Sequence, residues 1–326
     1  MTYRVLIPDS LDPSALNLLA EAGITAIGGG QMARSEVLSA VAEVDALIVR
    51  SATTVDAELL AAALRLRLVV RAGVGVDNVD LEEATRRSVV VMNTPAGNTI
   101  AAAEHTLALM LALARHIPAA HAALQAGRWD RRAFMGVELR GKTLGIIGFG
   151  RVGQAVARRA AVFGMRILAC DPHRTPQMEQ VIAEVGGQLV DLEALLTQAD
   201  FISLHATLTA ETRGMINART IARMKRGVRL INTARGALIV EADLAEALRS
   251  GHVAGAAVDV YSEEPPPADH PLLGLPNVVH TPHLAASTFE AQTDVATEAA
   301  QLVIDALLRG EYRNVVNPEV LAGRKP

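Results

Sequence analysis

The sequence predicts an α/β protein with two doubly wound parallel sheets, each in a unit of its own. Three observations predict this fold. Short apolar runs alternate with helical stretches in the first part of the chain, the alternation restarts near Gly141, and a glycine-rich loop separates a strand from a helix in mid-chain. With 326 residues, the chain is long enough for two domains with their own cores.

In the first unit, apolar runs of strand length alternate with stretches of helical pattern. The expected strands are 5–7, 24–27, 46–49, 68–70 and 89–92, and the expected helices are 13–22, 35–41, 56–64 and 80–86. A long apolar helix over 98–116 follows, for which Asn98 is the expected N-cap. That helix carries Glu104, His105 and Arg115, so we interpret it as a packing helix and not as a membrane span.

The second unit begins after a break at 127–130. Its expected strands are 144–147, 166–169, 188–190, 201–204, 228–231, 255–258 and a short final one at 278–279. The proline-rich stretch 264–276 is expected to be a surface loop. Residues 287–308 are expected to form one last helix.

The composition narrows the class of protein. Half of the residues are hydrophobic and only 3% are aromatic, so Ala, Val, Leu and Ile must fill the cores. A net charge of −4 argues against nucleic acid or an anionic membrane as the main partner. The single cysteine, Cys170, excludes an intrachain disulfide framework. The first residues run straight into a strand without a signal-peptide pattern, so a cytoplasmic location is expected. No cluster has metal-ligand spacing, and no metal is expected.

The mid-chain glycine loop has the pattern of a dinucleotide-binding site. Gly148, Gly150 and Gly153 lie between a buried strand and a helix, and Asp171 ends the next strand about 20 residues later. The glycines allow the backbone to turn and to approach a pyrophosphate, and the helix N-terminus favours that anion. Asp171 favours NAD over NADP, because a carboxylate accepts from a ribose hydroxyl but repels a 2′-phosphate.

Three polar segments of the second unit each follow the carboxyl end of a strand, the edge at which open α/β sheets bind ligands. They supply Arg235, Glu264 and His283. An arginine suits a substrate carboxylate through its rigid donor fork. A histidine is the natural base for a hydroxyl proton near neutral pH, and a carboxylate on its other ring nitrogen selects the tautomer. Together they predict a dehydrogenase site for a 2-hydroxy acid.

With these motifs, the chain resembles the D-isomer-specific 2-hydroxyacid dehydrogenases. The segments 148–153, 232–236, 259–265 and 281–288 carry the resemblance, which extends to about residue 318. It implies that Arg235, Glu264 and His283 are catalytic. It also implies a Rossmann NAD-binding domain over 98–286, inserted into a flavodoxin-like substrate-binding domain made of 1–97 and 287–326.

The resemblance further implies which residues bind ligands. The NAD-binding residues would be Val74, Gly148, Gly150, Arg151, Val152, Gly153, Asp171, Ala206, Thr233, Ala234, Arg235, Asp259, His283, Ala285 and Ala286. The substrate-binding residues would be Arg50, Ser51, Gly73, Val74, Gly75, Asn98, Arg235 and His283. The segments 49–53, 71–80 and 93–98 are most like members that act on a phosphorylated substrate, and Arg50 could bind a phosphate.

The implied reaction is the NAD-dependent oxidation of 3-phospho-D-glycerate to 3-phosphohydroxypyruvate. Two alternatives stay open: a hydroxypyruvate or glyoxylate reductase or other D-2-hydroxyacid dehydrogenase, and an NAD(H)-sensing, corepressor-like binding protein. The family suggests a homodimer or homotetramer, with the helix 98–116 as a candidate contact. Many such relatives continue into C-terminal regulatory domains, and feedback through such a domain is not expected for a chain that stops at Pro326.

Further histidines are expected to be structural, namely His105, His205 and His280. Each lies on or beside an apolar segment, and none has a catalytic partner nearby in the sequence. Family members often have Pro two residues after His205, where this chain has Thr207.

Overall fold

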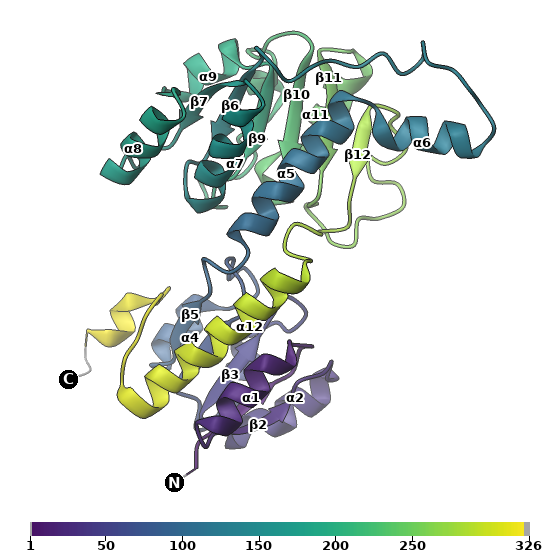
Figure 1. The fold of residues 1–326 in the computed structure, drawn as a ribbon. Helices are drawn as coiled ribbons and strands as arrows, with labels where there is room; N and C mark the ends of the chain where they lie inside the picture. Colours follow the sequence, from purple (N-terminus) through teal and green to yellow (C-terminus); the bar gives the residue numbers. More distant parts are fainter. Residues whose placement is uncertain (1, 323–326) are drawn as a thin grey trace. The chain divides into compact units, whose positions relative to one another are not determined.

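The chain forms two compact units in a computed structural model that describes residues 2–322 (Figure 1). Unit 1 comprises Met1–Asn98 and Ser287–Pro326, and unit 2 comprises Thr99–Ala286. Each unit contains one sheet in which every strand pair is parallel. The predicted α/β class with two parallel sheets is therefore confirmed.

The sheet of unit 1 has five strands in the order β2-β1-β3-β4-β5, which is the flavodoxin-like order. Its strands are β1 (Arg4–Ile7), β2 (Thr25–Gly28), β3 (Ala46–Val49), β4 (Leu68–Arg71) and β5 (Val90–Asn93). Its helices are α1 (Pro13–Glu21), α2 (Arg34–Ala40), α3 (Ala57–Ala62), α4 (Leu81–Arg86) and α12 (Phe289–Ile304).

Helices cover both faces of this sheet. Because successive strand residues point to opposite faces, Val5 and Ile7 pack with α1 and α12. Leu6 packs on the other side with α2, α3 and α4. The last helix begins later and ends earlier than the sequence pattern predicts, since α12 gives way at Ile304 to a π-helical turn, Asp305–Arg309. The buried Asp305 carboxylate accepts there from Arg309 and Arg313.

The sheet of unit 2 has seven strands in the order β12-β11-β10-β9-β6-β7-β8. Its strands are β6 (Thr143–Ile147), β7 (Arg166–Cys170), β8 (Gln188–Leu189), β9 (Phe201–Leu204), β10 (Val228–Asn232), β11 (Val253–Val258) and β12 (Val278–His280). The first six follow the Rossmann order, and β12 adds a strand at one edge. Strand order reverses between β6 and β9, and such a switch point is where α/β sheets bind ligands.

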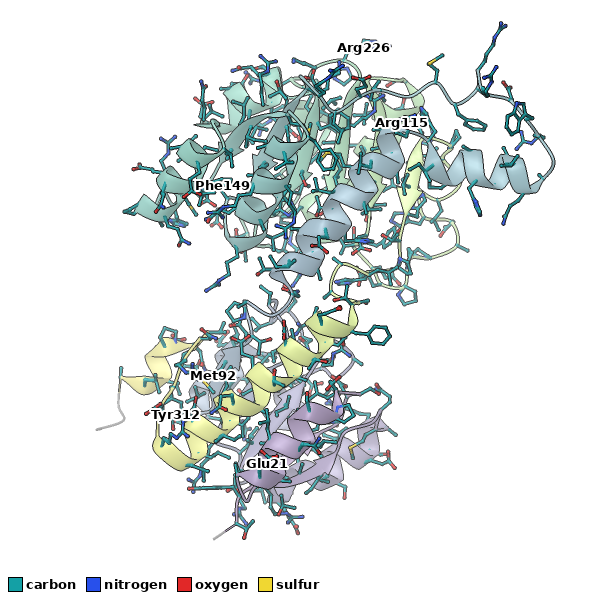
Figure 2. The ribbon with its side chains drawn as sticks, viewed as in Figure 1. Glu21, Met92, Arg115, Phe149, Arg226 and Tyr312 are labelled. Carbon is teal, nitrogen blue, oxygen red and sulfur yellow. The ribbon has the colours of Figure 1, made fainter. Side chains whose placement is uncertain are left out.

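The helices of unit 2 also cover both faces of its sheet. They are α5 (Thr99–Ala114), α6 (Ile117–Gln125), α7 (Arg151–Val162), α8 (Pro176–Glu184), α9 (Leu192–Gln198), α10 (Ala218–Ile221) and α11 (Glu241–Arg249). Leu144 and Ile146 of β6 pack with α5, α7 and α8. Ile147 packs with α9, α10 and α11 on the opposite face. Figure 2 shows Phe149, which follows Gly148 and is fully buried in the first of these two clusters.

The apolar helix predicted over 98–116 begins directly after Asn98 and ends earlier than expected. It runs from Thr99 to Ala114, and a left-handed residue, His116 (φ +53°), separates it from α6. Asn98 precedes the helix, but its Oδ1 atom is buried with no hydrogen-bond partner among residues 2–322, so the expected side-chain cap is not formed. The apolar face of α5 packs against its own sheet, as the contacts of Leu107 and Met110 show.

The helices were compared with the length and apolar character that a membrane span needs. Within residues 2–322, no helix taken alone has both the length and the apolar character of one; α5 and α6 reach them only as a pair, with a 61° bend at their junction.

Candidate active site

The glycine loop after β6 uses each glycine for a different steric reason. Gly148 has φ +90°, and a Cβ there would lie 2.5 Å from the backbone nitrogen of Ala206. A Cβ on Gly153 would lie 2.3 Å from the Gly148 carbonyl oxygen, so this glycine allows α7 to pack closely on the loop. Apart from its neighbours in the chain, Gly150 has no atom of the described residues within 4 Å of the place that its Cβ would take. The protein itself therefore needs the first and third glycines, and leaves open space at the second.

This open space fits the pyrophosphate of a dinucleotide. Gly150 is the N-cap of α7, so Arg151 and Val152 begin a helix whose N-terminal amides favour an anion. Asp171, which follows β7, lies beside the loop: its Oδ2 accepts from the Phe149 amide at 2.8 Å. Each carboxylate oxygen has two lone pairs, so Asp171 keeps acceptor capacity for ribose hydroxyls.

A histidine, His205, directly follows β9, the second strand at the switch point, and lies beside the glycine loop. The backbone atoms of His205 and Ala206 are those that a Cβ on Gly148 would meet most closely. The His205 ring pairs with the Ser203 hydroxyl, at 2.8 Å between Nε2 and Oγ. Burial lowers the pKa of His205 from 6.5 to about 4, so the ring is neutral at physiological pH. The sequence indicated only a structural histidine here.

Arg235 is held by the turn that follows β10. The buried Asn232 side chain donates from Nδ2 to the Arg235 carbonyl at 2.9 Å and accepts from the Ala234 amide at 3.1 Å. A Cβ on Gly236 would lie 1.9 Å from the carbonyl carbon of Tyr261. Only glycine therefore lets the Arg235 turn lie against the loop that follows β11. Thr233, in the same turn, pairs with Thr106 of α5 at 2.9 Å between the hydroxyl oxygens.

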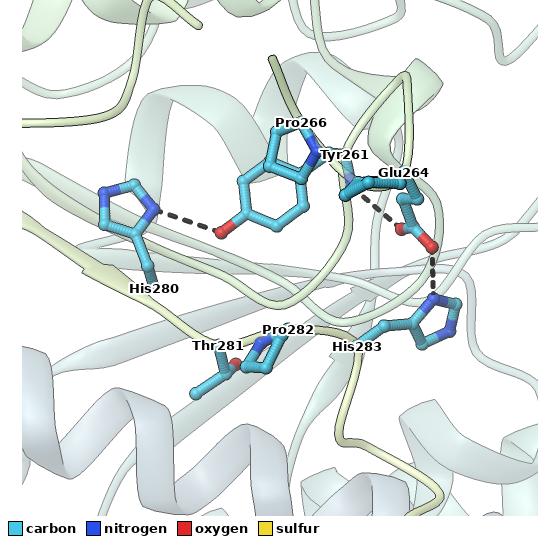
Figure 3. Close-up of a pocket in the computed structure, with 8 residues that line it drawn as sticks. Tyr261, Glu264, Pro266, His280, Thr281, Pro282 and His283 are labelled. Atoms are coloured by element: carbon cyan, nitrogen blue, oxygen red, sulfur yellow. Dashed lines mark hydrogen bonds and ion pairs between the residues drawn. The ribbon is translucent and has the colours of Figure 1, made fainter. Parts of the chain in front are cut away.

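Glu264 and His283 form a directly hydrogen-bonded pair (Figure 3). His283 Nδ1 lies 2.7 Å from Glu264 Oε2, and the other carboxylate oxygen accepts from the Tyr261 amide at 3.0 Å. Burial opposes ionisation of Glu264, but bonds from His283 and Tyr261 and the charge of Arg235 outweigh it, so the pKa of Glu264 lies below its ordinary value. A carboxylate cannot donate, so Nδ1 carries the proton and Nε2 is the nitrogen able to accept one.

A buried carboxylate, Asp259, directly follows β11 and contacts the turn that carries His283. It is fully buried and accepts from the Thr281 hydroxyl at 2.6 Å and from the amides of Leu284 and Ala285 at 2.8 and 2.9 Å. Burial disfavours its charge, but hydrogen bonds from His105, Thr281 and the two amides outweigh burial and lower the pKa of Asp259. Asp259 is therefore ionised and binds the turn that carries His283.

A pocket of about 390 Å³ adjoins the Glu264–His283 pair. Its wall consists of Tyr261, Glu264, Pro265, Pro266, His280, Thr281, Pro282 and His283 (Figure 3). The Tyr261 hydroxyl lies 3.1 Å from His280 Nδ1. Burial raises the pKa of Tyr261 to about 12 and lowers that of His280, so both are neutral near pH 7.

Apart from Asn98, the residues predicted to bind substrate in unit 1 follow neighbouring strands, β3 and β4. The Arg50 backbone is fixed by its amide, which donates to buried Asp9, while its guanidinium donates to the Ser10 carbonyl at 3.2 Å. Ser51 is exposed beside it. The loop after β4 contains Gly73, with φ +141°, and continues through the exposed Val74 to Gly75. Asp9, which sequence reasoning missed, therefore supports the Arg50 segment.

Sequence reasoning also missed the contact between His105 and Asp259. His105 Nε2 lies 3.2 Å from Asp259 Oδ1, although 154 residues separate them. The histidine stands in an apolar helix pattern with no catalytic-looking neighbour, so no local signal pointed to this contact. Only the packing of α5 beside β11 brings the two together.

The chain is similar in sequence to known 2-hydroxyacid dehydrogenases. A family model described as the NAD binding domain of D-isomer specific 2-hydroxyacid dehydrogenases matches residues 107–285. The D-3-phosphoglycerate dehydrogenase of Mycobacterium bovis is 48% identical, over 97% of this chain and 60% of the relative. The chain thus spans about three fifths of the length of the curated relatives it matches.

Solved structures agree with this similarity. The TT0316 protein from Thermus thermophilus has a TM-score of 0.86 and 39% identity, covering 96% of this chain and 99% of that one. A glyoxylate reductase from Paecilomyes thermophila has a TM-score of 0.88 and 30% identity, covering 97% and 98%.

Proposed function

Because the chain belongs to the D-isomer-specific 2-hydroxyacid dehydrogenases, with an NAD-binding domain over residues 107–285, we propose that it oxidises 3-phospho-D-glycerate to 3-phosphohydroxypyruvate. The observation that carries the reaction type is the hydrogen-bonded pair of His283 and Glu264, next to Arg235, in the unit with the dinucleotide loop. Relatives named D-3-phosphoglycerate dehydrogenase support the choice of substrate.

Each catalytic side chain has one task in this proposal. Arg235 binds the substrate carboxylate through its planar donor fork. His283 accepts the proton of the C2 hydroxyl at Nε2, because Nδ1–H already donates to Glu264. The Glu264 carboxylate stabilises the imidazolium that forms. If bound in unit 2, NAD would supply the acceptor for the hydride of C2, and oxidation of the C2 hydroxyl would leave a carbonyl.

The cofactor would be held by unit 2. Gly148, Gly150, Arg151, Val152 and Gly153 would hold its pyrophosphate, and Asp171 its adenosine ribose. Within unit 2, contacts with the rest of the cofactor are proposed for Ala206, Thr233, Ala234, Arg235, His283, Ala285 and Ala286. Of the two other residues that the sequence indicated, Val74 belongs to unit 1, and the side chain of Asp259 is fully buried. The open space at Gly150 supports this assignment.

For the substrate phosphate, we propose Arg50 and Ser51 as ligands. The backbone of Arg50 is fixed by Asp9, which lowers the entropic cost of presenting its side chain. The loop with Gly73, Val74 and Gly75, together with Asn98, would bind other parts of the substrate.

Steady-state kinetics on 3-phosphoglycerate and unphosphorylated D-glycerate, measured side by side, test the substrate. We expect kcat/KM to favour the phosphorylated acid, and Arg50→Ala to reduce that preference by about tenfold or more, the size of one lost charge-assisted contact. An Arg50→Ala variant that retains the full preference would refute the phosphate assignment.

A second variant tests the base. His283→Asn should lower kcat by about 10²–10⁴-fold, the usual contribution of general base catalysis, while NADH binding stays within about threefold of wild type. Substantial turnover in this variant would remove His283 from the base role. Intact NADH binding without turnover of any 2-hydroxy acid by the wild type would favour an NAD-sensing binding protein instead.

A hydroxypyruvate or glyoxylate reductase is the second candidate. The similarity to the glyoxylate reductase structure favours it. A kcat/KM for glyoxylate or hydroxypyruvate with NADH above that for 3-phosphohydroxypyruvate would select this reaction.

We also propose a homodimer or homotetramer. Because α5 uses its apolar face within unit 2, we place the subunit contact on α6 and the segment after it, where Ile117, Leu124, Trp129 and Met135 are more than half exposed. Light scattering after gel filtration tests this, and a monomer at micromolar concentration would contradict it.

A further inference from the structure

We propose that His105 is a positioning residue for His283 and acts through the buried carboxylate of Asp259. The catalytic part of this inference rests on the proposed function, since it assumes that His283 is the base. The structural contact stands independently of that assumption, because all groups involved lie in unit 2.

The turn that carries His283 has a backbone that needs support. His283 has φ +55°, in the left-handed region that residues with a Cβ rarely adopt. Such a conformation persists only where the surroundings over-determine it. A positioning device for this turn is therefore expected, and its failure would move the imidazole relative to the substrate.

Asp259 supplies that support from both its main chain and its side chain. Its carbonyl oxygen accepts from the His283 amide at 2.8 Å. Its carboxylate accepts from the amides of Leu284 and Ala285, one on each oxygen. Three successive amides of the turn thus donate to one residue, and the orientation of the carboxylate determines whether two of them keep their acceptor.

His105 helps to set that orientation. Its Nε2 atom lies 3.2 Å from Asp259 Oδ1 and 3.2 Å from the Thr281 hydroxyl oxygen. Because the Thr281 hydroxyl donates its own proton to Asp259, its oxygen is left as an acceptor. A proton on His105 Nε2 therefore has two acceptors in reach, Asp259 Oδ1 and the Thr281 hydroxyl oxygen. The His105 side chain is only 20% exposed, which limits competition from water.

The helix that carries His105 is held rigidly by packing. His105 lies in the middle of α5, where Leu107 and Met110 are buried against the sheet. A donor on a packed helix holds its partner more precisely in space than one on a loop. The chain of contacts therefore runs from a packed helix, through one ionised carboxylate, to the turn of the proposed base.

Two amide variants separate this role from a merely structural one. The His105→Gln variant can place an amide N–H near the position of Nε2. The His105→Asn variant is equally neutral and polar, but its donor lies nearer the position of Nδ1 and does not reach Asp259. The matched pair differs in reach and not in charge.

The first measurement is hydrogen–deuterium exchange in the protein without cofactor or substrate. In His105→Asn, we expect the amides of His283, Leu284 and Ala285 to exchange at least about tenfold faster than in wild type, with strand β6 unchanged as the internal reference. In His105→Gln, they should stay within about threefold of wild type. Equal behaviour of the two variants, or faster exchange that extends to β6, would overturn the proposal.

The second measurement is steady-state kinetics. His105→Asn should lower kcat by about 10- to 100-fold, with KM changed less than about threefold, because a displaced base slows the chemical step more than binding. His105→Gln should restore most of kcat. A loss in KM alone, or no rescue by Gln, would contradict positioning. Absence of any wild-type turnover would refute the proposed function, whereas the exchange comparison would still decide the contact of His105 with the turn.

Discussion

Replacing His205 by glutamine should make the protein less sensitive to acid. The backbone of this histidine lies close to Gly148, and its ring pairs with the Ser203 hydroxyl. Glutamine is neutral at all relevant pH values, and its amide can retain the partnership with the Ser203 hydroxyl. The substitution therefore removes the titration of this position and keeps much of its packing.

The sign and the size follow from two pKa values. The pKa of His205 is 6.5 in its ordinary state and about 4 in the folded protein, where burial disfavours the charged ring. Between these values the unfolded chain binds a proton and the folded protein does not, so stability falls as the pH falls. For a change from about pH 7 to about pH 5, this linkage amounts to at most about 2 kcal/mol.

Urea unfolding followed by circular dichroism measures this loss. Fluorescence is a poor reporter, because the single tryptophan, Trp129, is 78% exposed. Wild type should lose up to about 2 kcal/mol more than His205→Gln over this pH range. As a control, His121→Gln, at an exposed position of α6, should keep the wild-type loss. If wild type and His205→Gln lost the same free energy of unfolding over this pH range, the conclusion that His205 is neutral in the folded protein would be refuted.

Three further predictions concern the glycine loop and the proposed site. Gly148→Ala should lower the free energy of unfolding by about 1–3 kcal/mol, from left-handed strain and overpacking, whereas Gly150→Ala should leave it within about 0.5 kcal/mol and weaken NADH binding; urea unfolding and NADH titration of both variants decide this. Asp171→Ala should reduce the preference for NAD over NADP, as measured by kcat/KM with each cofactor; an unchanged ratio would contradict the ribose contact. Since the folded protein lowers the pKa of Glu264, its contribution to stability is present above the ordinary carboxyl pKa and is lost as the pH falls through the folded value; Glu264→Gln should therefore flatten the acid side of a Tm–pH profile.

Much of the fold could be predicted because its signals are local. Runs such as 46–49 and 68–70 are apolar over the length of a strand, which is typical of strands buried on both faces. The glycine loop was also predictable, because three glycines at this spacing between a strand and a helix form a local pattern. The atoms that a side chain at Gly148 would meet, those of His205 and Ala206, are distant in the sequence and became known only from the structure. The predicted boundaries erred where local signals are weak, as at 98–116, where the helix ends at Ala114 and the left-handed His116 precedes a second helix that begins at Ile117.

For the proposed site, the sequence by itself determined residue types and strand ends: Arg235, Glu264 and His283 each follow a strand, and parallel strands place such ends at one edge. Only the tertiary structure decided which partners meet. It paired His283 with Glu264 at 2.7 Å and brought His105 to Asp259 across 154 residues. The physical reason is that an apolar pattern indicates only which face of a helix is buried. Which polar group a side chain at the edge of that face contacts depends on how the helix packs on the sheet.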